Sequence, residues 1–130
     1  MSNKNFPEDL LYNEDYSWAK VDGDTAALGI VGPAASRVKE FVFVQLPEVG
    51  EKLKKGDTYV SLEAVKWSGH LSSPFSGEVV EVNEEIFDEP GKINQDPYGE
   101  GWIVKIKLDN KKETEDLLKP EEAEKWFEDQ

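Results

Sequence analysis

Short runs of β-favouring residues, each closed by a turn signal, constrain the fold of this chain more than any other feature of its sequence. The clearest run is WIVKIKL at 102–108, in which apolar side chains alternate with lysines and so share one face of a strand. Comparable runs are FVFVQL at 41–46, TYVSLEAV at 58–65 and GEVVEV at 77–82. Strands of this length bury an apolar face only against a second layer. The pattern therefore predicts a mostly β domain, built as a sandwich or barrel.

Two segments outside these runs favour helices. Pro33 suits the first turn of a short helix over residues 33–39, because proline lacks the amide that a helix leaves unbonded there. The tail over 111–130 has helical propensity interrupted at Pro120, and we expect its apolar side chains to pack on the body. Residues 1–16 are polar and predict an irregular lead-in.

Turn-forming residues complete the outline of the domain. Gly23 and Asp24 lie between two alternating runs and predict a β-hairpin over residues 17–30. A stretch rich in Pro, Gly, Asn and Asp over 86–102 predicts an ordered loop. With 130 residues the chain is long enough for one compact domain and too short for two ordinary ones. A single domain spanning 1–130 is therefore expected.

Charge and composition narrow the classes of function. The formal net charge of −13 predicts no binding to nucleic acid or anionic membranes and favours protein partners with basic surfaces, although solubility explains it equally well. With no cysteine and one histidine, neither a thiol nucleophile nor a metal site is expected. The absence of hydrolase, P-loop and dinucleotide fingerprints argues against an enzyme. Without a signal-peptide pattern or a membrane-length apolar segment, the expected location is the cytoplasm.

One lysine has an unusual position. The strand at 58–65 leads into a short polar break and is expected to resume around 70–73, so a hairpin places Lys66 at or near its tip. Two glycines and a proline around the return strand indicate a stiff unit. A lysine at a rigid tip offers its amine to the active site of another protein. An exposed lysine at a turn is more often simply solvated, so position alone does not establish a function.

The segment LEAVKWSGHLSSPFSGEVVEVN at 62–83 resembles the lipoyl-attachment hairpin of glycine-cleavage H proteins. This resemblance implies that Lys66 carries lipoate as an amide, and that Glu63 and Gly77 are read by the attaching enzyme. Further blocks are similar to family blocks in the same order, so the resemblance covers nearly the whole chain. These blocks are WAKVDGDTAALGI at 18–30, FVFVQLPEVGEKLKKGD at 41–57 and INQDPYGEGWIVKIKL at 93–108.

The resemblance also implies a fold and a function. The fold is a lipoyl/biotinyl-type hybrid β-sandwich, or flattened barrel, with a short internal helix and a C-terminal helix. The function is that of a non-catalytic, monomeric swinging-arm carrier, which a lipoate ligase or lipoyl transferase loads. It then moves an aminomethyl group among glycine decarboxylase, aminomethyltransferase and dihydrolipoyl dehydrogenase. Biotin fits less well, because a biotinyl lysine lies between methionines, whereas Lys66 lies between Val65 and Trp67.

Departures from the family pattern leave the cargo open. Ser17 stands where the family has a glutamate, His70 stands where it often has an acid, and Trp67 replaces a small residue. The first two changes remove carboxylates that would pair with a cationic amine, although Asp15 is a substitute nearby in sequence. Trp67 and His70 are expected beside the arm. One alternative is an H-like carrier of sulfur intermediates for a heterodisulfide-reductase-like complex in sulfur oxidation. Another is a binding module whose Lys66 stays unmodified.

Overall fold

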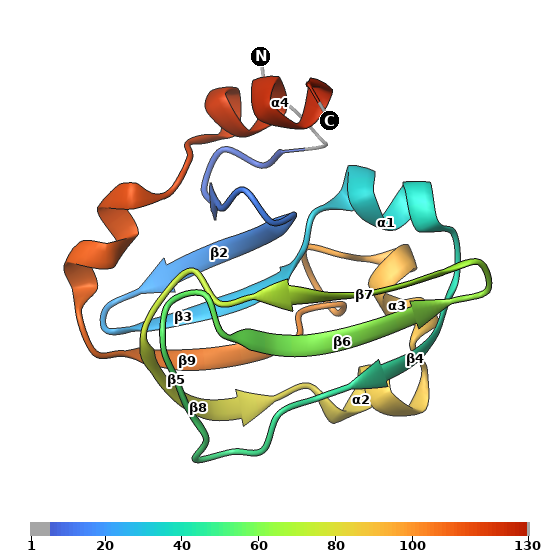
Figure 1. Cartoon of the computed structure of the whole chain (residues 1–130), viewed down its shortest axis with the longest axis horizontal. Coiled ribbons are helices and arrows are strands. Elements are labelled where there is room, and N and C mark those ends of the chain that lie inside the picture. Colours follow the sequence, from blue (N-terminus) through green and yellow to red (C-terminus); the bar gives the residue numbers. More distant parts are fainter. Residues whose placement is uncertain (1–5, 130) are drawn as a thin grey trace.

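The computed structural model describes residues 6–129, whose secondary structure is mostly β (Figure 1). The strands are β1 (Leu11–Tyr12), β2 (Ser17–Asp22), β3 (Thr25–Ile30), β4 (Phe41–Gln45), β5 (Lys52–Leu53), β6 (Thr58–Ala64), β7 (Trp67–Ser72), β8 (Gly77–Val82) and β9 (Val104–Leu108). The helices are α1 (Gly32–Val38), α2 (Glu84–Asp88), α3 (Gly91–Gln95) and α4 (Pro120–Glu128), with a 3-10 helix η1 over Lys111–Asp116.

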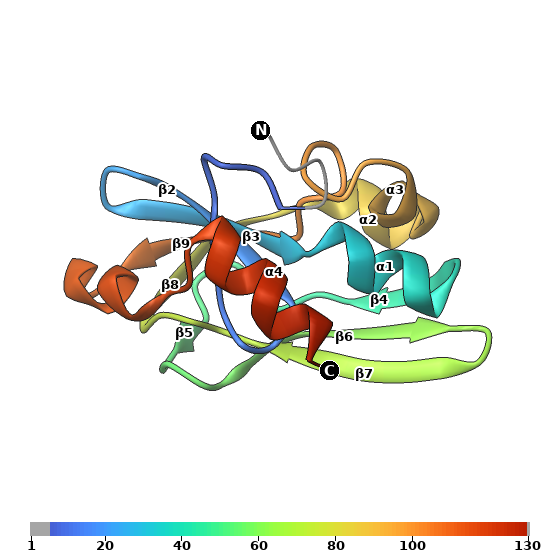
Figure 2. The same cartoon turned by 90° about the horizontal axis from the view of Figure 1, so that it is seen from above.

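The strands form two antiparallel sheets. The larger sheet has the order β1-β2-β3-β9-β8-β5, and the smaller sheet has the order β4-β6-β7. Figure 2 shows the β6–β7 hairpin along one side of the molecule and β2 and β3 along the other. Neither sheet closes on itself. The predicted sandwich is therefore confirmed in an open form rather than as a closed barrel.

The core lies between the two sheets and follows the alternation of the strands. Along β9, Val104, Ile106 and Leu108 are buried while Lys107 is exposed, as the sequence predicts for a strand with one wet face. Other strands and loops supply further side chains with no exposed surface, namely Leu28, Val44, Leu62, Phe75 and Val79. Burial of these groups against each other fixes how the sheets face one another.

Helix α1 confirms the predicted internal helix within one residue at each end. Pro33 lies in its first turn. The helix ends at Lys39, whose φ of 67° and ψ of −149° lie far from helical values and so stop the helical hydrogen-bond pattern. The Asn94 side chain donates hydrogen bonds to the carbonyls of Ala35 and Lys39, which fastens this end of α1 to α3.

The segment over 86–102 is ordered, but the prediction of a loop there was wrong, because helix α2 extends into it and α3 lies within it. Buried Asn83 explains the order. Its side-chain oxygen caps α2 by accepting a hydrogen bond from the Glu85 amide at 3.2 Å. Its amide group donates to the carbonyls of Glu100 and Trp102 at 2.8 and 2.7 Å. One side chain thus joins the two ends of the segment.

The two ends of the chain are tied together. Within the lead-in, where an irregular segment was expected, β1 pairs with β2; residues 1–5 lie outside the described part. Tyr12 and Leu118 exchange backbone hydrogen bonds of 2.9 and 2.7 Å. Pro120 begins α4, and this helix packs Phe127 against the ring of Phe6 at 6.0 Å. Between residues 6 and 129, no helix is long and apolar enough to cross a membrane.

Candidate functional site

The β6–β7 hairpin places Lys66 at an exposed tip, and Figure 1 shows this tip projecting beyond the rest of the fold. Ala64 pairs with Trp67, so the turn consists of Val65 and Lys66 alone. Val65 is 76% exposed. The expected polar break up to residue 70 was wrong, since residues 67–69 already belong to β7. Because β6 and β7 are paired right up to the turn, the backbone of Lys66 is held in a fixed position.

Trp67 stiffens the tip from the inner side of β7. Its indole ring covers Gly69, where an added Cβ would lie 2.5 Å from Trp67 Cζ2. The same ring meets buried Phe41 edge-on, with centroids 6.3 Å apart. Trp67 nevertheless stays 37% exposed. It therefore joins the packed interior of the hairpin to the surface beside Lys66.

Glu63 lies on the outer face of the smaller sheet, one ladder position before the tip. Its partners in register are Ser68 on β7 and Phe43 on β4. Because side chains alternate along a strand, Glu63 points away from the core and is exposed. Glu63 and Lys66 are thus accessible together at one end of the hairpin. Recognition of Glu63 by an attaching enzyme stays a prediction.

Gly77 lies away from the tip, because β8 begins on the opposite side of the molecule (Figure 1). It pairs with Leu108 of β9 and with Leu53 of β5, and it is buried. A Cβ at this position would run into the Lys107 carbonyl oxygen and lie 2.6 Å from Ile106 Cγ2. Close backbone packing therefore requires glycine here whether or not an enzyme reads it.

A cleft of about 550 Å³ opens beside β7, next to the lysine. Its walls come from the turn before β2, the end of β3, helix α1, strand β7 and helix α4. The apolar part of the lining consists of Ile30, Ala34, Val38, Trp67, Gly69, Leu71 and Phe127. The titratable part consists of Asp15, Tyr16, Arg37 and His70. Trp67 and His70, the two residues expected beside an arm, both line this cleft, with their side chains on opposite faces of β7 because side chains alternate along a strand.

Asp15 is fixed at the rim of the cleft. One carboxylate oxygen accepts a hydrogen bond of 2.5 Å from the Ser72 amide at the end of β7. The neighbouring Asn13 side chain accepts from the amides of Asp15 and Ser17 and donates to the Ser72 carbonyl. These bonds hold the lead-in against the edge of the smaller sheet. Among the lining residues, Asp15 supplies the one carboxylate.

Ser17 does not face the cleft. It is buried, and its hydroxyl lies 2.8 Å from the Tyr59 hydroxyl, so the pair links β2 of one sheet to β6 of the other. Burial raises the Tyr59 pKa well above its ordinary value, with the Ser17 hydrogen bond partly opposing this rise. The position where the resemblance implies a carboxylate is thus occupied by an inward, neutral hydroxyl.

Arg37 is a cleft residue that sequence reasoning missed. It lies in the last turn of α1, with its guanidinium carbon 4.1 Å from the centroid of the Phe127 ring. Tyr16 packs against the same ring at 5.7 Å and adopts a φ of 62°. The one available signal was that Arg37 is the single arginine of the chain. Its partner Phe127 lies ninety positions away, so no local sequence pattern indicates that the two side chains meet.

Comparison with known proteins decides the family. A sequence model of the family described as "Glycine cleavage H-protein" matches residues 10–130. The chain belongs to the glycine cleavage H-protein family. Members of this family are lipoyl carriers and not enzymes, so the expectation of a non-catalytic carrier subunit is confirmed.

Individual H proteins are similar over almost their full length. The chain is 44% identical over 125 residues to the glycine cleavage system H protein of Halothermothrix orenii, covering 96% of this chain and 98% of that protein. For the H protein of Carboxydothermus hydrogenoformans the identity is 42% over 124 residues, covering 95% of each. A crystal structure of an H protein from Mycobacterium marinum matches with a TM-score of 0.82 at 33% identity, covering 95% of this chain and 97% of that one. The H-protein fold is thereby confirmed.

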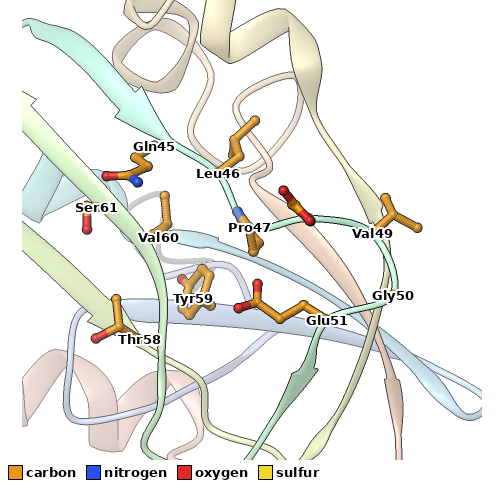
Figure 3. A pocket seen from close by; sticks show the side chains of 11 residues that line it. Gln45, Leu46, Pro47, Val49, Gly50, Glu51, Thr58, Tyr59, Val60 and Ser61 are labelled. Atoms are coloured by element: carbon orange, nitrogen blue, oxygen red, sulfur yellow. The ribbon is translucent and has the colours of Figure 1, made fainter.

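A larger hollow of about 710 Å³ lies at the other end of β6 (Figure 3). Figure 3 shows the end of β4 and the loop after it on one wall and the start of β6 on the other. Glu48, Glu51 and Tyr59 are among its lining residues, and no residue of the hairpin tip is. Lys66 is thus exposed beside the smaller of the two cavities, and the larger one lies away from the hairpin tip.

Proposed function

We propose that this chain carries a lipoyl arm on Lys66 and moves an aminomethyl group between the enzymes of glycine cleavage. The main support is the position of the lysine: it is exposed in a two-residue turn, and the cleft begins at Trp67, the residue next to it. The hairpin presents the Lys66 amine to a partner enzyme. The adjacent cleft encloses the arm while no enzyme is bound.

The residues present fit a lipoyl group. No ion pair among residues 6–129 includes Lys66, so its amine is open to acylation, which would remove the charge. A mostly apolar wall, including Ile30, Val38 and Leu71, suits an aliphatic chain. Bound lipoate supplies thiol–disulfide chemistry, which a chain without cysteine does not have.

The chain's own residues position and shelter the arm. The paired strands up to Ala64 and Trp67 keep the lysine at a fixed place, which raises the effective concentration of the arm at a docked enzyme. The apolar lining excludes water from part of the cleft. A cationic amine in the cleft would pair with Asp15, since the other side chains of the wall supply no negative charge near neutral pH.

The partners follow from the same function. Glycine decarboxylase, aminomethyltransferase and dihydrolipoyl dehydrogenase would dock in turn, after a lipoate ligase or lipoyl transferase has attached the arm. A net charge of −13 suits basic patches on these enzymes and fast, weak encounters. A monomer in the cytoplasm, where the lysine stays accessible, is the state in which we expect the carrier to work.

One observation favours a second candidate function. Arg37 and His70 line the same cleft, so it also suits an anionic cargo. An H-like carrier of sulfur intermediates, working with a heterodisulfide-reductase-like complex, would use such groups. A binding module with unmodified Lys66 has no comparable support, because it assigns no role to the cleft beside the lysine.

The test is the intact mass of the chain after incubation with lipoate ligase, lipoate and ATP, followed by peptide mapping. One lipoyl group on Lys66 is expected. Lys66→Arg should stay folded and unmodified, whereas Lys20→Arg, at an exposed lysine of β2, should be modified like the wild type. A lipoylated Lys66→Arg variant would show that the site is wrong. An unmodified wild type, under conditions that modify another H protein, would favour the binding module.

A further inference from the structure

The cleft beside Lys66 carries charges that a neutral aliphatic arm does not need. Arg37 and His70 line it together with a single carboxylate, Asp15. We propose that Arg37 favours the thiolate form of the reduced arm inside the cleft. This inference rests on the proposed attachment at Lys66, and it concerns the arm itself rather than the group that it carries.

The charge of Arg37 is held in place without being neutralised. Its guanidinium lies 4.1 Å from the centroid of the Phe127 ring, a contact that orients a cation while keeping its charge. No ion pair among residues 6–129 includes Arg37. The carboxylate of the cleft, Asp15, is instead bound to the Ser72 amide. The cleft therefore presents a positive group with no acidic partner of its own.

His70 lies on the strand that leads away from the attachment lysine. It is four residues beyond Lys66, roughly 13 Å along an extended strand. Trp67 lies between them in sequence and lines the same cleft. Arg37 from α1 and His70 from β7 thus contribute to the lining from separate elements, and the charge that acts on a group held there is that of Arg37.

The physical effect of these charges has a definite sign. Apolar walls such as Val38, Leu71 and Phe127 disfavour a thiolate by removing water from it. A cation in the same partly dehydrated space favours the thiolate more strongly than it would in bulk water. Asp15 opposes this effect, and Tyr16 is the remaining titratable residue of the lining. Ionisation releases the thiol proton to solvent and moves no electrons, so it needs no co-reactant.

A cysteine-free chain makes this effect measurable, because the thiols of a lipoylated sample then belong only to the arm. The lipoylated protein is reduced and freed of reductant, and its alkylation by iodoacetamide is followed by intact mass across a pH series. The midpoint of the rate profile reports ionisation of the first thiol. We expect Arg37→Gln to raise this midpoint by about half a unit to one unit.

Three further variants separate the cleft effect from other causes. Lys20→Gln makes the same change in net charge outside the cleft and should leave the midpoint in place. Arg37→Lys keeps the cation and should restore most of the wild-type value. Asp15→Asn keeps an oxygen that can accept from Ser72 and should lower the midpoint. Circular dichroism checks that α4 stays folded when its Arg37 contact is changed.

The possible outcomes are distinct. Equal midpoints for Arg37→Gln and the wild type, or equal shifts for Arg37→Gln and Lys20→Gln, would overturn the inference while leaving lipoylation of Lys66 intact. A chain that gains no lipoyl mass would instead overturn the proposed function. Opposite shifts for Arg37→Gln and Asp15→Asn support a cleft that controls the ionisation of the arm.

Discussion

The Trp67 ring occupies the space above Gly69, so that an alanine Cβ at residue 69 would lie 2.5 Å from Cζ2 and 2.7 Å from Cη2 of the indole. Both residues lie on the same side of β7, two positions apart. Because residue 69 is glycine, the Trp67 ring can lie over it, next to Lys66. This pairing also shapes the cleft, whose lining includes both residues.

Gly69→Ala should displace the Trp67 ring and destabilise the protein by about 1–3 kcal/mol, because the strand leaves no room for an added methyl group. Urea unfolding and tryptophan fluorescence measure the two effects. Gly91→Ala is the matched control, since its Cβ would meet only Glu40 Oε1 at 3.7 Å. In a Trp67→Ala background the cost of Gly69→Ala should nearly vanish. An unchanged cost in that background would mean that the ring is not the obstacle.

Gly77→Ala should lower the free energy of unfolding by about 3 kcal/mol. The added Cβ meets a backbone carbonyl that cannot move aside without breaking the pairing of β8 with β9. The loss is measured by urea unfolding. Lipoylation of this variant should slow only in proportion to its unfolded fraction. If lipoate were attached to the fully folded variant much more slowly than to the wild type, Gly77 would be a recognition residue as well as a packing residue.

Glu63→Gln should slow lipoate attachment by roughly threefold or more while leaving stability unchanged, since the residue is exposed and its charge faces outward beside the tip. The initial rate of mass increase with limiting ligase provides the measurement. Glu48→Gln, an exposed acid beside the distant hollow, is the control for net charge. Equal rates for the two variants would remove the proposed role of Glu63.

Tyr98→Phe should lower the free energy of unfolding at pH 8 by about 1 kcal/mol, because the Gly32 amide loses its hydrogen-bond acceptor. Burial raises the pKa of Tyr98 to about 12, above the ordinary value near 10. Between these two values the unfolded chain releases a proton that the folded wild type keeps, so wild-type stability falls as pH rises. The Tyr98→Phe variant has no hydroxyl to ionise at residue 98, so its stability does not fall for this reason. The stability difference measured by urea unfolding should therefore shrink from pH 10 upward, and a constant difference would contradict the raised pKa.

Much of the fold was predictable because its signals are local. The alternation at 102–108 and the dense run at 58–65 specify strands β9 and β6, and Pro33 marks the start of α1. Helices α2 and α3 were missed because each is only five residues long. Their order depends on Asn83 reaching carbonyls some twenty positions away, which no local pattern encodes.

The candidate site divides in the same way. The sequence determined the hairpin, its tip lysine and the exposed Glu63, since strand periodicity and a short turn fix which residues lie at a tip and which face outward. Only the tertiary structure decided that Arg37, His70, Asp15 and Phe127 line one cleft, and that Ser17 turns inward to Tyr59. These neighbours come from separate elements. Packing of the two sheets with α1 and α4 brings them together, and that packing depends on side-chain shape across the whole core rather than on neighbours in sequence.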